Sequence, residues 1–362
     1  MQLIVQWVKR TFSDPQLVVL LSLLLVGFAI VITMGDMLAP VLASIVIAYL
    51  LEGLVAPLQK LGLPRMLAVV IVFILFLIFL GLIIFGLMPL LSRQVTQLVQ
   101  QLPNMLAEGQ NTLMMLPEKY PELITAEQVQ EVIGTIGSEI GNMGQRVLSW
   151  SLSSVVGVIT ILVYLVLMPL LVFFFLKDKH LILGWFAGML PRDRKIALHV
   201  WREVDGQISN YVRGKFWEII IVWSASFVTF TLMGLQYAML LSVLVGLSVI
   251  IPYIGATVVT FPVLVVAWFQ WGWTADFGWL ALAYFIIQTL DGNVLVPLLF
   301  SEVVSLHPIA IIVAILVFGG FWGFWGVFFA IPLATLVNAV IQAWPTRREL
   351  DAKLAEQEAV SS

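Results

Sequence analysis

Five polar residues that are suited to binding or proton transfer lie in one short stretch, residues 288–308, of otherwise apolar sequence. They are Gln288, Asp291, Asn293, Glu302 and His307. An ionised carboxylate in hydrocarbon is costly, so an acid in a membrane segment usually holds a proton, pairs with a cation or contacts water. We therefore take these residues as candidates for transport or for coupling to an ion, and Asp291 as the leading candidate.

The surroundings of Asp291 favour a proton-binding or cation-binding role. Residues 216–346 contain no Lys or Arg that could pair with the acid. The alternative is that Asp291 lies at the membrane surface, where Gly292 and Asn293 would end a helix. Glu302 and His307 are expected nearer the surface than Asp291.

Two long apolar blocks flank this stretch, at residues 238–270 and 309–341. Each is clearly longer than the roughly 20 residues that one membrane span needs, and each is interrupted by Gly or Pro. Each block is either a re-entrant hairpin or one tilted, kinked helix, and irregular backbone within it must face protein or a wet cavity. The residues expected to shape the backbone here are Pro252, Gly255, Pro262, Pro297, Pro308, Gly319, Gly320 and Gly323.

The composition requires a lipid environment. Hydrophobic residues make up 61% of the 362 residues and charged residues 11%, and the mean hydropathy is +1.05. The apolar runs are continuous rather than alternating, which excludes a membrane β-barrel. We predict an all-α, polytopic helical membrane protein with about eight membrane segments, two of them broken or re-entrant, and a small helical insertion on the outer side.

Changes in charge and hydropathy divide the chain into segments. Eight of the eighteen Lys and Arg residues lie between Lys177 and Lys215, which places that loop in the cytoplasm. Both termini are expected on the same side. The predicted segments are the N-terminal spans (residues 1–88), a polar periplasmic insertion of amphipathic helices (89–150), a fourth span (151–176), the basic cytoplasmic loop (177–215), the C-terminal membrane core (216–346) and a cytoplasmic tail (347–362).

Two further patterns have both a functional and a structural interpretation. Gly134, Gly137, Gly141 and Gly144 line one side of a predicted helix, which indicates either close contact between subunits or a loose linker. Arg213 and Glu218 form either a cytoplasmic gate pair or an anchor for the fifth span.

Several motifs together resemble those of a known family. They are Tyr211-Val-Arg213-Gly214-Lys215, Gly234, Ile251-Pro252-Tyr253-Ile254-Gly255 with Pro262, Gln288-Thr-Leu-Asp291-Gly292-Asn293 with Pro297, Leu306-His307-Pro308, and the glycine-rich run that ends at Pro332. This pattern resembles the autoinducer-2 exporter family, permeases of bacterial inner membranes. Asp291 stands where we expect Glu, and Ser301 where we expect Gly.

The resemblance implies a transporter of roughly eight spans that exports small molecules, in some members autoinducer-2. It also implies proton or sodium/proton exchange in other members, and homo-oligomers, specifically pentamers. The expected partners are therefore the lipid bilayer, a small-molecule substrate and further copies of the chain.

We expect a secondary transporter of the bacterial inner membrane. The alternatives are a sodium/proton antiporter, a channel, or a membrane-embedded scaffold that acts through its outer insertion. An enzyme is not expected, because the sequence has no His-Glu-x-x-His, no Gly-Lys-Ser/Thr phosphate loop and no convincing Ser/His/Asp set. Cysteine is absent, so thiolate chemistry is excluded. No cofactor, metal or nucleic acid is expected.

Overall fold

The computed structural model describes residues 15–114, 130, 134, 155–189, 195–252, 254–300 and 307–342. Within these ranges every regular element is a helix, which confirms the predicted all-α class. In lipid each backbone N–H and C=O needs a partner within the protein, and a helix supplies these partners locally.

The described part contains six helices that are long and apolar enough to cross a membrane, and three shorter apolar helices. The long ones are Met37–Lys60, Arg65–Gln110, Val204–Leu232, Ile254–Trp271, Ala275–Phe300 and Ile309–Phe328. The shorter ones are Val163–Lys177, Ala238–Ser248 and Ala330–Ala339. The chain is therefore a polytopic membrane protein.

The chain forms two compact units. The first unit contains residues 1–73, 168–219 and 291–362, and the second contains residues 74–167 and 220–290. Two helical stretches cross this division without a break: α9, Lys195–Leu232, and the run formed by α12 (Ala275–Leu290) and η2 (Asp291–Leu295). The position between residues 215 and 216, where the basic loop is predicted to end, lies inside α9.

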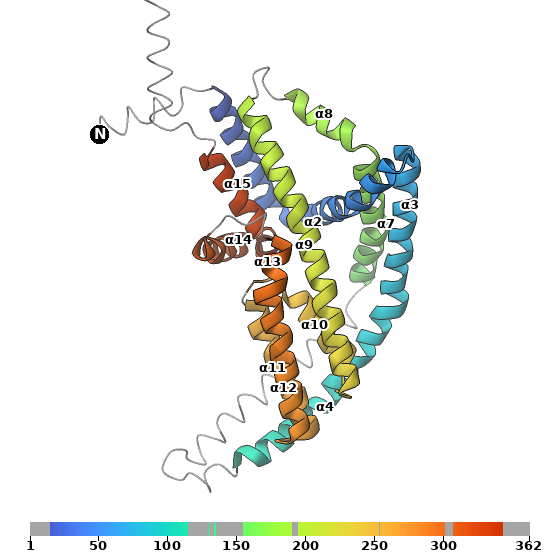
Figure 1. Cartoon of the computed structure of the whole chain (residues 1–362), viewed down its shortest axis with the longest axis vertical. Helices are drawn as coiled ribbons and strands as arrows, with labels where there is room; N and C mark the ends of the chain where they lie inside the picture. Colours follow the sequence, from blue (N-terminus) through green and yellow to red (C-terminus); the bar gives the residue numbers. More distant parts are fainter. Residues whose placement is uncertain are drawn as a thin grey trace, which may run out of the picture. The chain divides into compact units, whose positions relative to one another are not determined.

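Other helices of the first unit are α2, α8, α13, α14, α15, the beginning of α3 and the end of α7 (Val155–Lys177) (Figure 1). Their bounds are Pro15–Lys60 for α2, Arg65–Leu82 for α3, Lys179–Met189 for α8, Val296–Phe300 for α13, Pro308–Phe328 for α14 and Ala330–Gln342 for α15. α2 consists of two helical stretches that meet at a kink at Met34. Beside the kink, a Cβ on Gly35 would lie 2.0 Å from Nε1 of Trp322, so only glycine leaves room for this indole.

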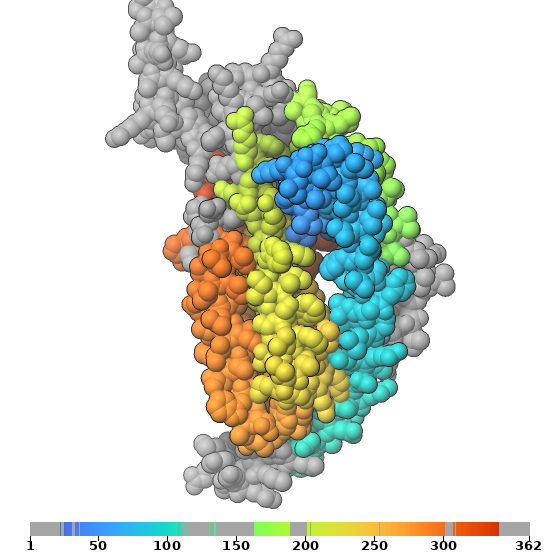
Figure 2. All heavy atoms as spheres, turned by 45° about the vertical axis from the view of Figure 1, so that its right-hand side comes forward, coloured from blue at the N-terminus to red at the C-terminus, as the bar shows by residue number. Residues whose placement is uncertain are grey.

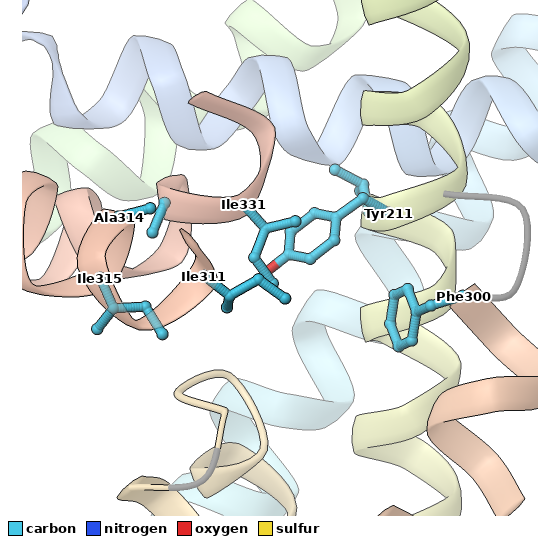
Figure 3. Packing of buried hydrophobic residues seen from close by; sticks show 8 residues of the cluster. Tyr211, Phe300, Ile311, Ala314, Ile315 and Ile331 are labelled. Atoms are coloured by element: carbon cyan, nitrogen blue, oxygen red, sulfur yellow. The ribbon is translucent and has the colours of Figure 1, made fainter. Parts of the chain in front are cut away.

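The core of the first unit forms around Tyr211 of α9. Figure 3 shows Tyr211 pointing toward Ile311 and Ile331, which come from α14 and α15. Phe300 at the end of α13 packs against the same tyrosine, with 5.9 Å between the ring centroids. The Tyr211 hydroxyl donates a hydrogen bond to the carbonyl oxygen of Phe328 at 3.3 Å. One aromatic side chain thus joins α9, α13 and the α14–α15 pair.

The apolar block at residues 309–341 is a pair of packed helices, α14 and α15. The reversal begins at Gly323, whose φ of 57° and ψ of −135° suit glycine rather than a residue with a side chain. A Cβ on Gly326 would lie 1.8 Å from the Phe318 carbonyl oxygen, so the two parts of α14 on either side of Gly323 approach closely there. Gly319 and Gly320 lie within α14, and Pro308 is its first residue.

The second unit contains η1 (Ile83–Leu87), α4 (Met88–Met114), α10 (Ala238–Ser248), α11 (Ile254–Trp271), α12 and parts of α3, α7 (Val155–Lys177) and α9. The apolar block at residues 238–270 consists of α10 and α11, which pack on each other. Pro252 lies in the turn between them, whereas Pro262 lies within α11 without ending it. α10 has 11 residues and rises about 1.5 Å per residue, which is too short for the roughly 30 Å hydrocarbon core.

The predicted polar insertion begins as a continuation of the third span. α3 passes through η1 directly into α4, so the first amphipathic helix is present but is not separate from the span. Gly134 is exposed and has open space around it. Gly137, Gly141 and Gly144 lie outside the described residues, and the interpretation of the stripe as a subunit contact stays a prediction.

Gln94 of α4 caps the first turn of α10. Its side-chain oxygen accepts a hydrogen bond from the Leu240 backbone N–H at 2.8 Å, one of the early N–H groups that have no partner within their own helix. Replacing Gln94 by leucine leaves this buried N–H unsatisfied, so we expect a loss of about 1–3 kcal/mol in the free energy of unfolding. Thermal unfolding of the full-length protein in detergent measures the loss. Gln94→Glu keeps the acceptor and should retain most of the stability; equal losses in both variants would contradict the capping role.

Candidate functional site: a buried charge cluster in the first unit

Asp291 lies inside a continuous helical stretch. It begins the π-helix η2 and is followed by α13, so the helix continues to Phe300 and does not end at Gly292 or Asn293. This stretch belongs to the apolar segment Ala275–Phe300, which is long enough to cross a membrane. Short π-helical segments within α-helices occur frequently at functional sites. The expectation that Gly292 and Asn293 end a helix, on which the surface alternative for Asp291 depended, is therefore wrong.

The carboxylate of Asp291 is buried and incompletely satisfied. The residue is 7% exposed, and its Oδ1 atom has no hydrogen-bond partner among the residues that the structure describes. A buried acid without full hydrogen bonding pays a large desolvation cost if it is ionised. Binding of a proton or a cation removes this cost. Asp291 is therefore the strongest candidate among the predicted site residues.

Lys215 and Glu218 of α9 form a buried ion pair in the same unit. The Nζ atom of Lys215 lies 2.7 Å from Oε2 of Glu218, and the side chains are 6% and 2% exposed. The ammonium also lies 5.2 Å from the centre of the Phe300 ring, within the range of a cation–π interaction. A Cβ on Gly214 would lie 2.7 Å from this ring, so the glycine permits Phe300 to approach α9.

Lys215, Glu218 and Asp291 together form one charge cluster. The Asp291 carboxylate interacts electrostatically with Lys215 and with Glu218. With all three groups ionised, the charge cluster has one positive and two negative charges. A proton or a small monovalent cation at Asp291 balances these charges, which is the chemistry that the site offers.

Sequence reasoning missed Lys215. The stretch without Lys or Arg begins at residue 216, directly after this lysine. Lys215 stands at the end of the predicted basic cytoplasmic loop, but it belongs to the helix that carries Glu218. The signal that identifies it is a Lys and a Glu three residues apart, which face each other on a helix.

Arg213 and Glu218 do not pair with each other in the described residues. The Arg213 side chain is exposed and donates a hydrogen bond to the Ser209 hydroxyl, one turn earlier on α9. It also lies against α2, because a Cβ on Gly53 would come within 3.3 Å of its Cδ and Nε atoms. Glu218 instead pairs with Lys215. These contacts suit an anchor rather than a gate formed by the two residues.

The other predicted site residues do not all join the charge cluster. Gln288 lies in the second unit and donates a hydrogen bond to the Tyr284 hydroxyl at 3.0 Å. Asn293 and Pro297 are exposed on η2 and α13. His307 is exposed and caps α14, since its Nδ1 atom accepts a hydrogen bond from the Ile309 N–H at 3.3 Å. Glu302 lies outside the described residues.

Comparisons with known proteins agree with this architecture. A model of the AI-2E family transporters matches residues 19–346. The chain is 47% identical over 345 residues to "Putative permease PerM" of Escherichia coli (strain K12), covering 95% of this chain and 98% of that protein. It is 27% identical over 312 residues to "Putative transport protein YueF" of Bacillus subtilis (strain 168), covering 83% and 82%. The resemblance seen in the sequence is therefore confirmed, and the chain belongs to the AI-2E transporter family.

Proposed function

We propose that this permease-family protein is a secondary transporter that exports a small molecule, an autoinducer-2-like or another metabolite, and that proton or sodium movement through Asp291 drives the export. Family membership supports transport. The observation that carries the proposal is the buried Asp291 carboxylate, one oxygen of which has no hydrogen-bond partner among the described residues, in a helix long enough to cross a membrane.

The contacts within the charge cluster indicate different roles for Asp291 and Glu218. Lys215 makes its 2.7 Å ion pair with Glu218, which fixes these two charges relative to each other on α9. Asp291 comes from a different helix and retains an oxygen without a hydrogen bond in the described part of the chain. Asp291 is therefore the acid suited to exchange a proton or a sodium ion, while Glu218 holds the lysine in place.

Phe300 provides a route by which ion binding changes the conformation. Its ring contacts the Lys215 ammonium and also packs against Tyr211 in the core formed by α9, α14 and α15. Loading or unloading Asp291 changes the net charge of the cluster by one unit. With a proton or a cation bound at Asp291 the charge cluster is neutral, and a neutral cluster costs less to bury than a charged one. Binding at Asp291 therefore shifts the population toward a conformation that buries the cluster more deeply, and secondary transport requires such a shift.

The decisive experiment is Asp291→Asn in proteoliposomes that contain the full-length protein. The amide has the size of the protonated acid but cannot release a proton or balance a cation, so gradient-driven export of loaded autoinducer-2 should fall to the level of empty liposomes. Sodium-driven proton flux, followed with an entrapped pH dye, should fall with it. Asp291→Glu retains the charge and serves as the matched control. Unchanged flux in Asp291→Asn, with normal assembly, would contradict the proposal and favour the scaffold alternative.

The same assay separates the related transport functions. A sodium/proton antiporter shows the dye response without loss of autoinducer-2, and a channel shows current that does not depend on a coupled gradient. We further propose that the protein resides in the inner membrane as a homo-oligomer with both termini in the cytoplasm. The concentration of Lys and Arg between residues 177 and 215 supports this orientation.

A further inference from the structure

α8 is a short helix with an uncovered aromatic face. It has 11 residues and follows α7 after a break at Asp178, so it is too short to cross the bilayer. Leu181, Trp185 and Phe186 are 74%, 60% and 57% exposed. The rings of Trp185 and Phe186 contact each other edge to face, with centroids 4.9 Å apart. Three large apolar side chains therefore form one exposed patch beside the end of the apolar helix α7.

A network of charges marks the level at which α8 begins. Glu52 of α2 pairs with Arg65 at 3.3 Å and with Lys179 at 3.5 Å. Arg65 also donates a hydrogen bond at 2.7 Å to the carbonyl oxygen of Leu176, near the end of α7. Figure 2 shows the light green surface of α8 beside the blue surface of α2 and the beginning of α3. Charged side chains at the ends of apolar helices lie at a membrane surface, so α8 starts at that surface.

We propose that α8 is an interfacial anchor that lies in the headgroup layer, with Leu181, Trp185 and Phe186 inserted among the acyl chains and Lys177 bound to the phosphate of an anionic lipid. Tryptophan is enriched at this depth of the bilayer, and helices with an apolar face and basic flanking residues lie in the interface plane. Lys177 is exposed and is the last residue of α7, directly before the break that leads into α8, so it is suited to reach a phosphate near the patch.

The roles of the neighbouring cations support this choice of residue. Lys179 is already engaged by Glu52, and Arg65 by Glu52 and Leu176. Lys177 contacts only the face of the Phe174 ring, at 5.9 Å, among the interactions of the described residues. A second copy of the chain is a poorer occupant of the patch, because a stable protein interface uses roughly 20–30 residues on each side.

The absence of cysteine in the chain allows single labelling sites. Leu181→Cys and Trp185→Cys, each carrying a nitroxide, are reconstituted as full-length protein in phosphatidylcholine vesicles that contain phosphatidylglycerol. We expect collisions with oxygen to exceed collisions with a water-soluble nickel complex at both positions. Leu183→Cys, on the half-buried side of α8, should be poorly accessible to both reagents. Greater access for nickel at 181 and 185 would overturn the anchor, as would spin–spin broadening that shows contact between copies.

Lys177→Gln tests the lipid headgroup in the Leu181→Cys background. In the parent, adding phosphatidylglycerol to phosphatidylcholine vesicles should move the label deeper, seen as a rise in the ratio of oxygen to nickel collisions. This rise should disappear in Lys177→Gln and persist in Arg93→Gln, an exposed site on α4 that loses the same charge. A rise that persists in Lys177→Gln would overturn the assignment of Lys177 to an anionic lipid.

Discussion

Replacing Lys215 by methionine should destabilise the protein by about 3–5 kcal/mol, the usual cost of removing one member of a buried ion pair. The variant leaves Glu218 and Asp291 as two neighbouring acids without their cation, and Glu218 is almost completely buried. Protonation of the acids relieves this cost, so the loss should be larger at high pH than at low pH. Thermal unfolding in detergent at several pH values measures both effects.

Two further variants isolate the role of the ion pair. Lys215→Met combined with Glu218→Gln removes both charges of the pair and should recover much of the stability, because no unpaired charge remains from it. Lys60→Met removes a lysine that is exposed at the end of α2 and should change the free energy of unfolding by no more than about 0.5 kcal/mol. A loss in Lys215→Met as small as that in Lys60→Met would contradict the buried pair.

Gly255→Ala should prevent the α10–α11 hairpin from closing, at a cost of about 3 kcal/mol or more. The added Cβ would lie 1.7 Å from the carbonyl oxygen of Ser248 and 2.6 Å from its carbonyl carbon. Both are backbone atoms and cannot rotate away as a side chain does. The two helices would have to separate, so we expect a large drop in the thermal unfolding temperature or a loss of monodisperse protein in size-exclusion chromatography.

Gly278→Ala is the matched control for this prediction. Gly278 lies in α12 of the same unit, is exposed, and has open space where a Cβ would be. Alanine is favoured over glycine within a helix by about 1 kcal/mol, so this variant should be neutral or slightly more stable. Equal behaviour of the two alanine variants would mean that the close approach at Ser248 is not needed.

The class of fold and the breaks in the two apolar blocks could be predicted from the sequence. Continuous apolar runs specify helices in lipid, and the glycines and prolines at residues 252–255 and 319–323 predicted that neither block is one regular helix. The choice between a hairpin and a tilted helix depends on close packing, such as that of Gly255 against Ser248 and Gly326 against Phe318. Such contacts join residues that no period in the sequence relates to each other.

The candidate site was predicted only in part. Asp291 was identifiable because an acid in an apolar segment is costly. The ion pair of Lys215 with Glu218 was not identifiable from the sequence. A lysine at the end of a basic loop gives the same sequence pattern whether it lies at the membrane surface and orients the chain or is buried in the core. Glu302 and His307 were grouped with Asp291 by their closeness in sequence. His307 instead caps a helix, a role that depends on the backbone direction at Pro308.

The π-helix at Asp291–Leu295 determines which side of the helix Phe300 occupies. In a regular α-helix each residue advances by about 100°, so two positions nine residues apart, as Asp291 and Phe300 are, point to opposite sides. The wider turn of the π-helix takes up roughly one residue and reduces this separation to about a quarter of a turn. The π-helix therefore brings the Asp291 carboxylate and the Phe300 ring closer to one side of the same helix, so that both can interact with Lys215.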